Sequence, residues 1–267
     1  MKAYFSYFKL RFINSFQYRA AAIAGVCTQF FWGFMEIMIF EAFYLNGSAN
    51  VSISFQDMVN YLWLQQSFLY FFMLWYRDNE LLVIIKNGNI SYELCRPHDI
   101  YPFWFGKMIA QRLSGAILRF FPIIIVAILL PMPYKITPPE SLLSFLLFVI
   151  TLSLGLVITC TISLFVHLIA FITIESKGIM DLLFIMGEFL SGSIIPVPFM
   201  PNFLKTICYI FPFRLASDLP FRTYSGNIGV TEAGLSVFLQ LFWIFVLVIA
   251  GNLMMKSITK KVLVQGG

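Results

Sequence analysis

The sequence predicts an all-α integral membrane protein with six membrane-spanning helices. Apolar residues make up 60% of the 267 residues and charged residues only 12%, against about 25% charged in a soluble domain. The apolar residues stand in continuous runs that suit helices of roughly 20 residues, whereas a transmembrane barrel would show short alternating strands. The basic residues lie mainly at the ends of these runs, as orientation signals do, so we expect no nucleic-acid partner.

The first 19 residues predict an interfacial helix and not a signal peptide. Phenylalanines recur at helical spacing from Phe5 to Phe16, and basic residues interrupt them, so no continuous apolar core is present. The side chains of Lys2, Lys9 and Arg19 can reach the lipid headgroups. We therefore expect residues 1–19 to lie along the membrane surface before the chain enters it.

Six apolar segments follow, and the residues between them set their limits. Asp57 and Arg77 bound the second segment, and four prolines separate the third from the fourth, because proline cannot continue a helix interior. A short turn at residues 175–178 precedes the fifth. The expected spans cover residues 20–45, 56–76, 105–130, 140–174, 179–195 and 233–255.

Two longer segments do not fit a span. Residues 77–104 are polar and carry charges of both signs, so we expect a structured loop that meets a partner. Residues 196–232 mix apolar stretches with Pro201, Pro212 and Pro220. Irregular backbone survives at membrane depth only where protein buries it or water lines it, so this segment predicts short helices that dip partly into the membrane.

The distribution of Lys and Arg predicts the orientation. With six spans both termini lie on one side, and that side collects thirteen of these residues. The opposite side has Lys135, Lys205, Arg214 and Arg222, while Arg119 remains inside a span. Because cytoplasmic loops carry the excess of positive charge, we expect both termini and residues 77–104 in the cytoplasm, and residues 196–232 outside.

The sequence carries no recognisable catalytic constellation. It has no phosphate-binding loop, HExxH or GxSxG pattern. Its four cysteines lack metal-ligand spacing, and His167 inside the fourth expected span favours a satisfied buried histidine over a proton relay. We therefore expect a protein that is not an enzyme and that itself binds no cofactor or metal.

Three ionisable residues, Glu36, Arg119 and Glu188, lie well inside expected spans. A charge in hydrocarbon costs about 2.5–3.5 kcal/mol on insertion scales, so these groups should face the bundle interior, a cavity or a partner. Arg112 and Arg119 are seven residues apart and share a helix face. Two interpretations stay open: a polar stripe along a substrate pathway, or an interhelical ion pair in which Arg119 meets Glu188 or Glu36.

A motif in the polar loop matches a known family. Residues 84–90 read Ile-Ile-Lys-Asn-Gly-Asn-Ile, and residues 94–97 read Leu-Cys-Arg-Pro. This run resembles the "apolar-x-x-Gly-x-Ile … Leu-x-Arg-Pro" pattern of permease subunits of bacterial type-two ABC exporters, in the drug-export-like branch of the ABC-2 family. The basic interfacial helix, six spans and broken segment before the sixth are similar to the same family over nearly the whole chain.

The resemblance implies a separate ATPase polypeptide, which binds ATP and Mg²⁺ and docks on a coupling helix at about residues 78–87. Leucines and isoleucines of this helix would fill an ATPase groove, with charged residues at the rim and Asn87-Gly88 as its end. The alternative is that residues 81–85 continue the second span, but Asp78-Asn79-Glu80 interrupts the apolar run. The expected coupling residues are Asp78, Glu80, Leu81, Ile84, Ile85, Lys86, Asn87 and Gly88.

The resemblance also implies a second permease subunit, with a heteromer favoured and a homodimer possible, in the lipid of the bacterial cytoplasmic membrane. The expected substrate is a hydrophobic or amphipathic compound, a peptide or a lipid-like molecule. An ion- or proton-coupled secondary transporter, or a membrane scaffold without an ATPase, is the alternative. Secondary transporters usually show inverted repeats with paired broken helices, and only one broken region is evident here.

Overall fold

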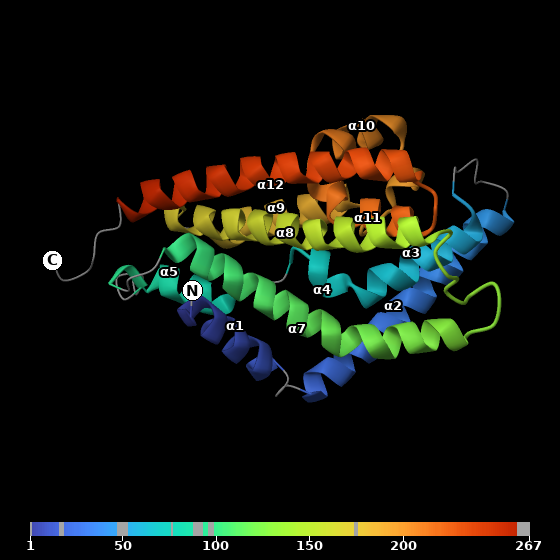
Figure 1. The fold of residues 1–267 in the computed structure, drawn as a ribbon, viewed down its shortest axis with the longest axis horizontal. Helices are drawn as coiled ribbons and strands as arrows, with labels where there is room; N and C mark the ends of the chain where they lie inside the picture. Colours follow the sequence, from blue (N-terminus) through green and yellow to red (C-terminus); the bar gives the residue numbers. More distant parts are fainter. Residues whose placement is uncertain are drawn as a thin grey trace.

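The computed structural model describes residues 2–15, 19–46, 53–75, 77–87, 93–95, 99–173 and 176–260, and these residues form helices and turns without a strand. The all-α prediction is confirmed for them. Figure 1 shows long helices that run roughly along one axis, with shorter helices packed between and beside them.

Four helices are long and apolar enough to cross a membrane: α2 (Arg19–Leu45), α7 (Ile100–Leu129), α8 (Leu142–Ile172) and α12 (Val230–Thr259). They cover the first, third, fourth and sixth expected spans. The start of α7 corrects one boundary, because the helix begins at Ile100 and the expected span begins at residue 105. Residues 100–104 therefore belong to this helix and not to the polar loop. Pro102 lies in its first turn, where a missing N–H costs no helical hydrogen bond.

The second and fifth expected spans are shorter helices. Residues 56–76 contain α3 (Phe55–Ser67) and the single turn α4 (Leu69–Phe72), and residues 179–195 contain most of α9 (Ser176–Ser191). The 13 residues of α3 rise only about 20 Å, less than the roughly 30 Å of hydrocarbon. Phe68 separates α3 from α4 because its backbone leaves the helical conformation. The prediction of six complete spans is not confirmed by these lengths.

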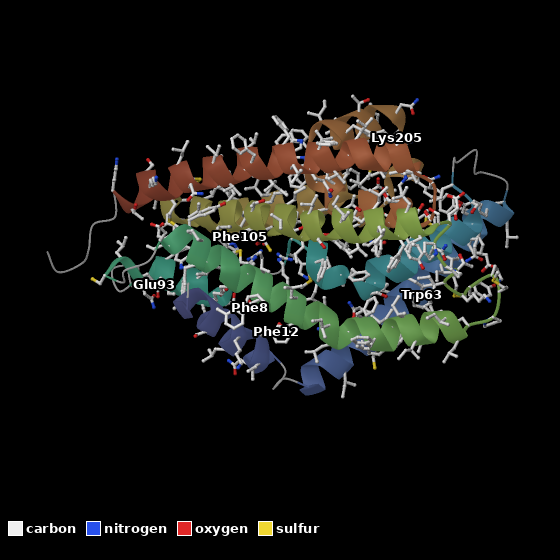
Figure 2. The ribbon with its side chains drawn as sticks, viewed as in Figure 1. Phe8, Phe12, Trp63, Glu93, Phe105 and Lys205 are labelled. Carbon is white, nitrogen blue, oxygen red and sulfur yellow. The ribbon has the colours of Figure 1, made fainter. Side chains whose placement is uncertain are left out.

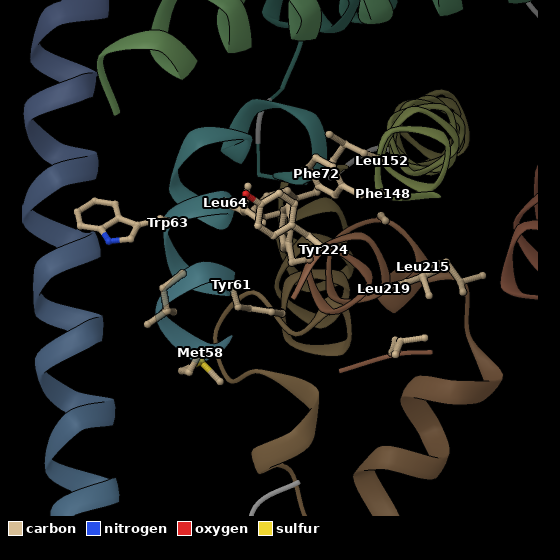
Figure 3. Packing of buried hydrophobic residues seen from close by; sticks show 14 of the residues in the cluster. Met58, Tyr61, Trp63, Leu64, Phe72, Phe148, Leu152, Leu215, Leu219 and Tyr224 are labelled. Atoms are coloured by element: carbon tan, nitrogen blue, oxygen red, sulfur yellow. The ribbon is translucent and has the colours of Figure 1, made fainter. Parts of the chain in front are cut away.

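Helix α8 is the centre of the bundle. It packs along α12 and also contacts α7, α9 and α11 (Asp218–Tyr224). Figure 3 shows Leu64 of α3 beside Phe148 and Leu152 of α8 and beside Tyr224, and Tyr61 of α3 meets Phe221 at a centroid distance of 5.5 Å in the same buried cluster. Because this cluster joins segments far apart in the sequence, it holds the broken second segment inside the bundle.

The proline-rich segment folds into η1 (Val197–Phe199), α10 (Asn202–Ile210), η2 (Phe213–Leu215) and α11 (Asp218–Tyr224). The prediction of short, broken helices is confirmed here. The side chains of Asp218, Leu219 and Phe221 are fully buried, so α11 is an inserted core element. Burial raises the pKa of the Asp218 carboxyl, and Arg222 and Arg214 oppose that shift. Arg222 pairs with Asp218 at 3.3 Å, which compensates the buried charge.

Helix α1 (Lys2–Ser15) forms where the sequence predicts the interfacial helix, and it packs along α7. Phe8 and Phe12 stack at a centroid distance of 6.2 Å on the side of α1 that faces α7 (Figure 2). Phe5, Leu10 and Ile13 are exposed, which leaves an apolar surface for lipid. The start of α1, the end of α12 and the polar-loop helix α5 (Asn79–Lys86) all lie toward one end of the molecule (Figure 1).

The packing of α8 against the backbone of Ala216 can be tested at Gly155, where the two segments lie close together. A Cβ atom on Gly155 of α8 would lie 2.7 Å from the carbonyl oxygen of Ala216 and 3.1 Å from its Cα. We expect Gly155→Ala to lower the free energy of unfolding by about 1–3 kcal/mol, because the backbone neighbour cannot rotate away. The measurement is the thermal unfolding midpoint in detergent, followed with a thiol-reactive dye that reports exposure of Cys160 and Cys208.

Gly234→Ala in α12 is the matched control, because nothing lies within 4 Å of its added Cβ. Alanine there should leave the midpoint unchanged or raise it slightly, since it is the better helix former. Equal midpoints for the two variants would show that α8 does not approach Ala216 this closely.

Candidate functional site

The candidate site is the polar-loop helix α5 with the groups that hold it. Asp78 precedes the helix, and its Oδ1 accepts hydrogen bonds from the backbone N–H groups of Glu80 and Leu81 at 3.1 and 3.2 Å. An aspartate at this position satisfies N–H groups that lack a partner within the helix and suits the positive end of the helix dipole. The sequence prediction of a helix at about residues 78–87 is therefore confirmed as a structural element, while its docking role stays a prediction.

The face of α5 that packs inward differs from the expectation. Leu81 is 1% exposed and lies in a cluster with Ile100 and Trp104 of α7. Ile84 and Ile85 are partly buried against the same core. The interpretation that these residues fill an ATPase groove is wrong for Leu81, because the chain's own α7 already covers this side chain.

The outward face of α5 is polar with one apolar residue. Asn79, Glu80, Val83 and Asn87 are exposed, and their spacing places them along one side of the helix. Asn87 follows the last helical residue, and its N–H bonds the carbonyl of Val83 at 3.0 Å. Two further expected coupling residues cannot be placed: the Lys86 side chain and Gly88 lie outside the described residues.

A buried lysine ties α5 to α7. Lys107 Nζ lies 3.0 Å from Asp78 Oδ1 and 2.9 Å from Oδ2, and both side chains are about 3–4% exposed. The same ammonium lies 2.9 Å from Glu80 Oε2, on a side chain that is 57% exposed. Because a buried charge must be paired to be tolerated, Lys107 and Asp78 fix the beginning of α5 against α7.

A histidine ties the same point to α8. The backbone N–H of Asp78 donates to His167 Nε2 at 3.2 Å, and His167 Nδ1 lies 2.7 Å from the carbonyl oxygen of Ser163. Since Nε2 accepts, Nδ1 carries the proton and donates to Ser163. His167 is therefore a buried histidine with both nitrogens satisfied, in agreement with the interpretation from sequence.

Two charged side chains satisfy the irregular backbone between α4 and α5. Arg112 of α7, 2% exposed, donates from Nη1 to the carbonyl oxygens of Tyr70 and Met73 at 3.1 and 2.8 Å. Glu188 of α9, 5% exposed, accepts from the backbone N–H of Leu74. Backbone that leaves a helix inside a protein of this composition needs such partners. We call the described residues 73–75 and 77–78, with these contacts, the α4–α5 break.

Of the two interpretations left open for the intramembrane charges, the ion pair of Arg119 with Glu188 or Glu36 is wrong. Arg119 donates to the hydroxyl of Tyr70 at 3.1 Å, and its guanidinium carbon lies 4.4 Å from the ring centroid. Glu36 accepts a hydrogen bond from Gln66 Nε2 at 3.2 Å, and Glu188 accepts one from the backbone N–H of Leu74 in the α4–α5 break. No ion pair joins Arg119 to either carboxylate in the part of the chain that the structure describes.

The prediction that Arg112 and Arg119 lie on the same face of their helix is confirmed, because both side chains contact Tyr70. Arg112 binds its carbonyl oxygen, and Arg119 binds its ring and hydroxyl. Sequence reasoning missed Lys107 and His167 as holders of α5. The sequence did contain one indication, because Asp99 is a residue type that often precedes a helix. A helix that starts at Ile100 places Lys107 two turns inside α7 and not near its start.

A comparison with known protein families gives a match for this chain. The family model described as "ABC-2 family transporter protein" matches residues 30–265. The matched segment contains α5, the α4–α5 break and every long helix beyond the first part of α2. Neither the curated proteins nor the solved structures gave a match.

The buried pair at α5 predicts an asymmetric response to substitution. Lys107→Met should destabilise the protein by about 3–5 kcal/mol, because it leaves the buried Asp78 carboxylate without its countercharge. Glu80→Gln removes the ion pair of Lys107 with the exposed Glu80 carboxylate and keeps the buried pair with Asp78. It should cost at most about 1 kcal/mol. Thermal unfolding midpoints of both variants in detergent provide the measurement, and equal midpoints would rule out a structural role for the buried pair.

The two arginines of α7 provide a second comparison. Arg112→Met leaves the buried carbonyl group of Met73 without its donor, at a cost of about 1–3 kcal/mol, and also removes the partly buried bond to the carbonyl group of Tyr70. Arg119→Met loses one hydrogen bond of about 1 kcal/mol and a ring contact of about 0.5–1 kcal/mol. We therefore expect the larger fall in unfolding midpoint for Arg112→Met. The reverse order would mean that Arg119 has a buried partner, as the ion-pair hypothesis required.

Proposed function

The chain belongs to the ABC-2 transporter family, and on that premise we propose that it is the permease subunit of an ATP-driven exporter, coupled to a separate ATPase. Family membership and four long apolar helices make it a multi-pass membrane protein of an ABC transporter. The observation that carries the coupling proposal is α5. It is a short helix with one exposed face, at the end of the molecule where α1 begins and α12 ends (Figure 1).

The charge distribution supports a cytoplasmic position for α5. The start of α1 and the end of α12 lie at the same end as α5, and the sequences of these two helices include Lys2, Lys9 and Lys256. Cytoplasmic segments carry the excess of basic residues. An ATPase that docks there would meet Asn79, Glu80 and Val83, the exposed residues of the helix. ATP and Mg²⁺ belong to that partner in this proposal.

The contacts of α5 supply a mechanical route to the long helices. Lys107 ties Asp78 to α7, and His167 ties the same residue to α8. Arg112 then connects the chain immediately before α5 to α7. When the ATPase subunits close on ATP and displace α5, these buried contacts carry the displacement to the helices that form the pathway.

The charged side chains inside the bundle support an ion-coupled transporter less well than an ATP-driven one. Such a mechanism needs ionisable groups that exchange a bound ion or proton along a pathway. Here Arg112 and Glu188 satisfy backbone groups, and Glu36 accepts from Gln66. Because these groups stabilise the fold, they are not available to carry an ion or proton. This favours a transporter that a separate ATPase drives.

The proposed exporter contains two permease subunits, in a heteromer or a homodimer, in the bacterial cytoplasmic membrane. The outward face of α2 offers an apolar surface for such a contact, because Phe31, Met38 and Phe43 are at least half exposed. The substrate class that fits an apolar bundle is a hydrophobic or amphipathic compound, a peptide or a lipid-like molecule.

The coupling proposal predicts the effect of a charge on the outward face of α5. Val83 is 52% exposed, so Val83→Glu should leave the fold intact and place an unpaired carboxylate in the ATPase contact. We expect at least a tenfold loss of binding, about 1.4 kcal/mol or more. The measurement is co-purification with an ATPase encoded beside the gene for this chain, followed by vanadate-sensitive ATP hydrolysis of the complex.

Val230→Glu is the control, since Val230 is 38% exposed and begins α12 at the opposite end of the molecule. It should co-purify with the ATPase as the wild-type chain does. Full binding and ATP hydrolysis by Val83→Glu would place the ATPase contact elsewhere. The absence of any ATPase that binds the wild-type chain would contradict the proposed function itself.

A further inference from the structure

A cavity of about 690 Å³ lies between the second segment and helices α7 and α8. Its walls are apolar, with Phe68 just before α4 and Phe71 in it, Phe120 and Ile124 on α7, and Phe148 and Leu152 on α8. Lys135 and Thr137, in the loop that joins α7 to α8, also line it. None of the groups that hold α5 lines this cavity, so it is separate from the candidate site.

Packed rings keep the cavity open. Phe68 meets Phe120 at a centroid distance of 4.9 Å and Phe148 at 5.9 Å. Phe148 in turn meets Tyr224 edge-on at 5.2 Å, and Figure 3 shows these two rings beside Leu64 and Leu152. Rings that already pack against one another have little freedom to collapse into the space between the helices.

The cavity opens sideways between two helices that are long enough to span a membrane. Ile128 of α7 and Val149 of α8 line it and are 56% and 43% exposed. The medium around these helices is lipid hydrocarbon in a chain of this family. From Phe120 to Ile128 the helix rises about 12 Å, so the cavity is an elongated apolar slot with one side in the acyl-chain region.

Lys135 carries the one charge among the residues that line the cavity. Its ammonium makes no ion pair among the described residues. The loop that carries it is fixed, because the carbonyl oxygens of Tyr134 and Lys135 accept from Trp63 Nε1 at 2.8 Å and Gln56 Nε2 at 2.9 Å. An apolar slot with a lysine on an anchored loop matches an anionic amphiphile, with its chain in the slot and its headgroup at the lysine.

We propose that this cavity binds one acyl chain of an anionic membrane phospholipid, with the phosphate held by Lys135. The lipid enters from the bilayer through the opening between α7 and α8. The phospholipid is the source that the structure favours, because the opening faces the membrane and not solvent. This proposal goes beyond the permease function, and it does not require an ATPase or a transported substrate.

Native mass spectrometry of the full-length chain tests the site, with phosphatidylglycerol or phosphatidylcholine added to the detergent-purified protein. The wild-type chain should retain one phosphatidylglycerol, and it should prefer this lipid to phosphatidylcholine. Lys135→Gln should reduce that preference about fivefold, the contribution of one lysine at an anionic lipid surface. Val149→Trp should abolish retention, because the indole fills the opening.

Ile150→Trp is the matched control, since Ile150 is 45% exposed on the same helix and does not line the cavity. It should retain the lipid. Ser153→Trp, at another lining position, repeats the test if Val149→Trp fails to fold. Equal lipid retention by filled and control variants would overturn the site. Equal binding of phosphatidylcholine would overturn recognition by Lys135, and preferential retention of a free fatty acid would overturn the phospholipid assignment.

Discussion

The structure depends on partners for backbone groups that leave a helix in an apolar interior. In hydrocarbon each unsatisfied N–H or C=O costs several kcal/mol, so a break in a buried segment persists only where side chains replace the missing bonds. Arg112 supplies donors to two carbonyl groups, Glu188 accepts one N–H, and His167 accepts another. These three side chains come from α7, α9 and α8. The break therefore joins the long helices as well as interrupting the second segment.

This constraint explains which parts of the fold were readable in the sequence. The four long helices were predictable because a continuous apolar run reports a span directly. The shortened second segment was not, because hydropathy does not reveal that Arg112 and Glu188 can satisfy a chain that stops being helical. The start of α7 was missed for a related reason. Its first turns carry aromatic residues such as Trp104, which resemble an interfacial loop until Asp99 is recognised as the residue before the helix.

The candidate site was predictable in its location and not in its contacts. Asp78 and its neighbours identified α5, since local capping is encoded in adjacent residues. The direction of its apolar face was not encoded locally, because α7 and an external partner offer similar surfaces to Leu81. Likewise the seven-residue spacing placed Arg112 and Arg119 on one face. Their partner is the backbone and ring of Tyr70, and a sequence does not show which main-chain groups a tertiary fold leaves exposed.

The short helix α4 connects the two sites that the structure contains. Tyr70 of α4 is held by Arg112 and Arg119, while the next residue, Phe71, lines the apolar cavity. The chain from α4 runs through the break directly into α5. A displacement of α5 that moves the break must therefore strain the contacts of Tyr70 or shift Phe71 with it. A lipid chain bound there as proposed would pack against Phe71, which would link occupation of the cavity to the position of α5 through one helical turn.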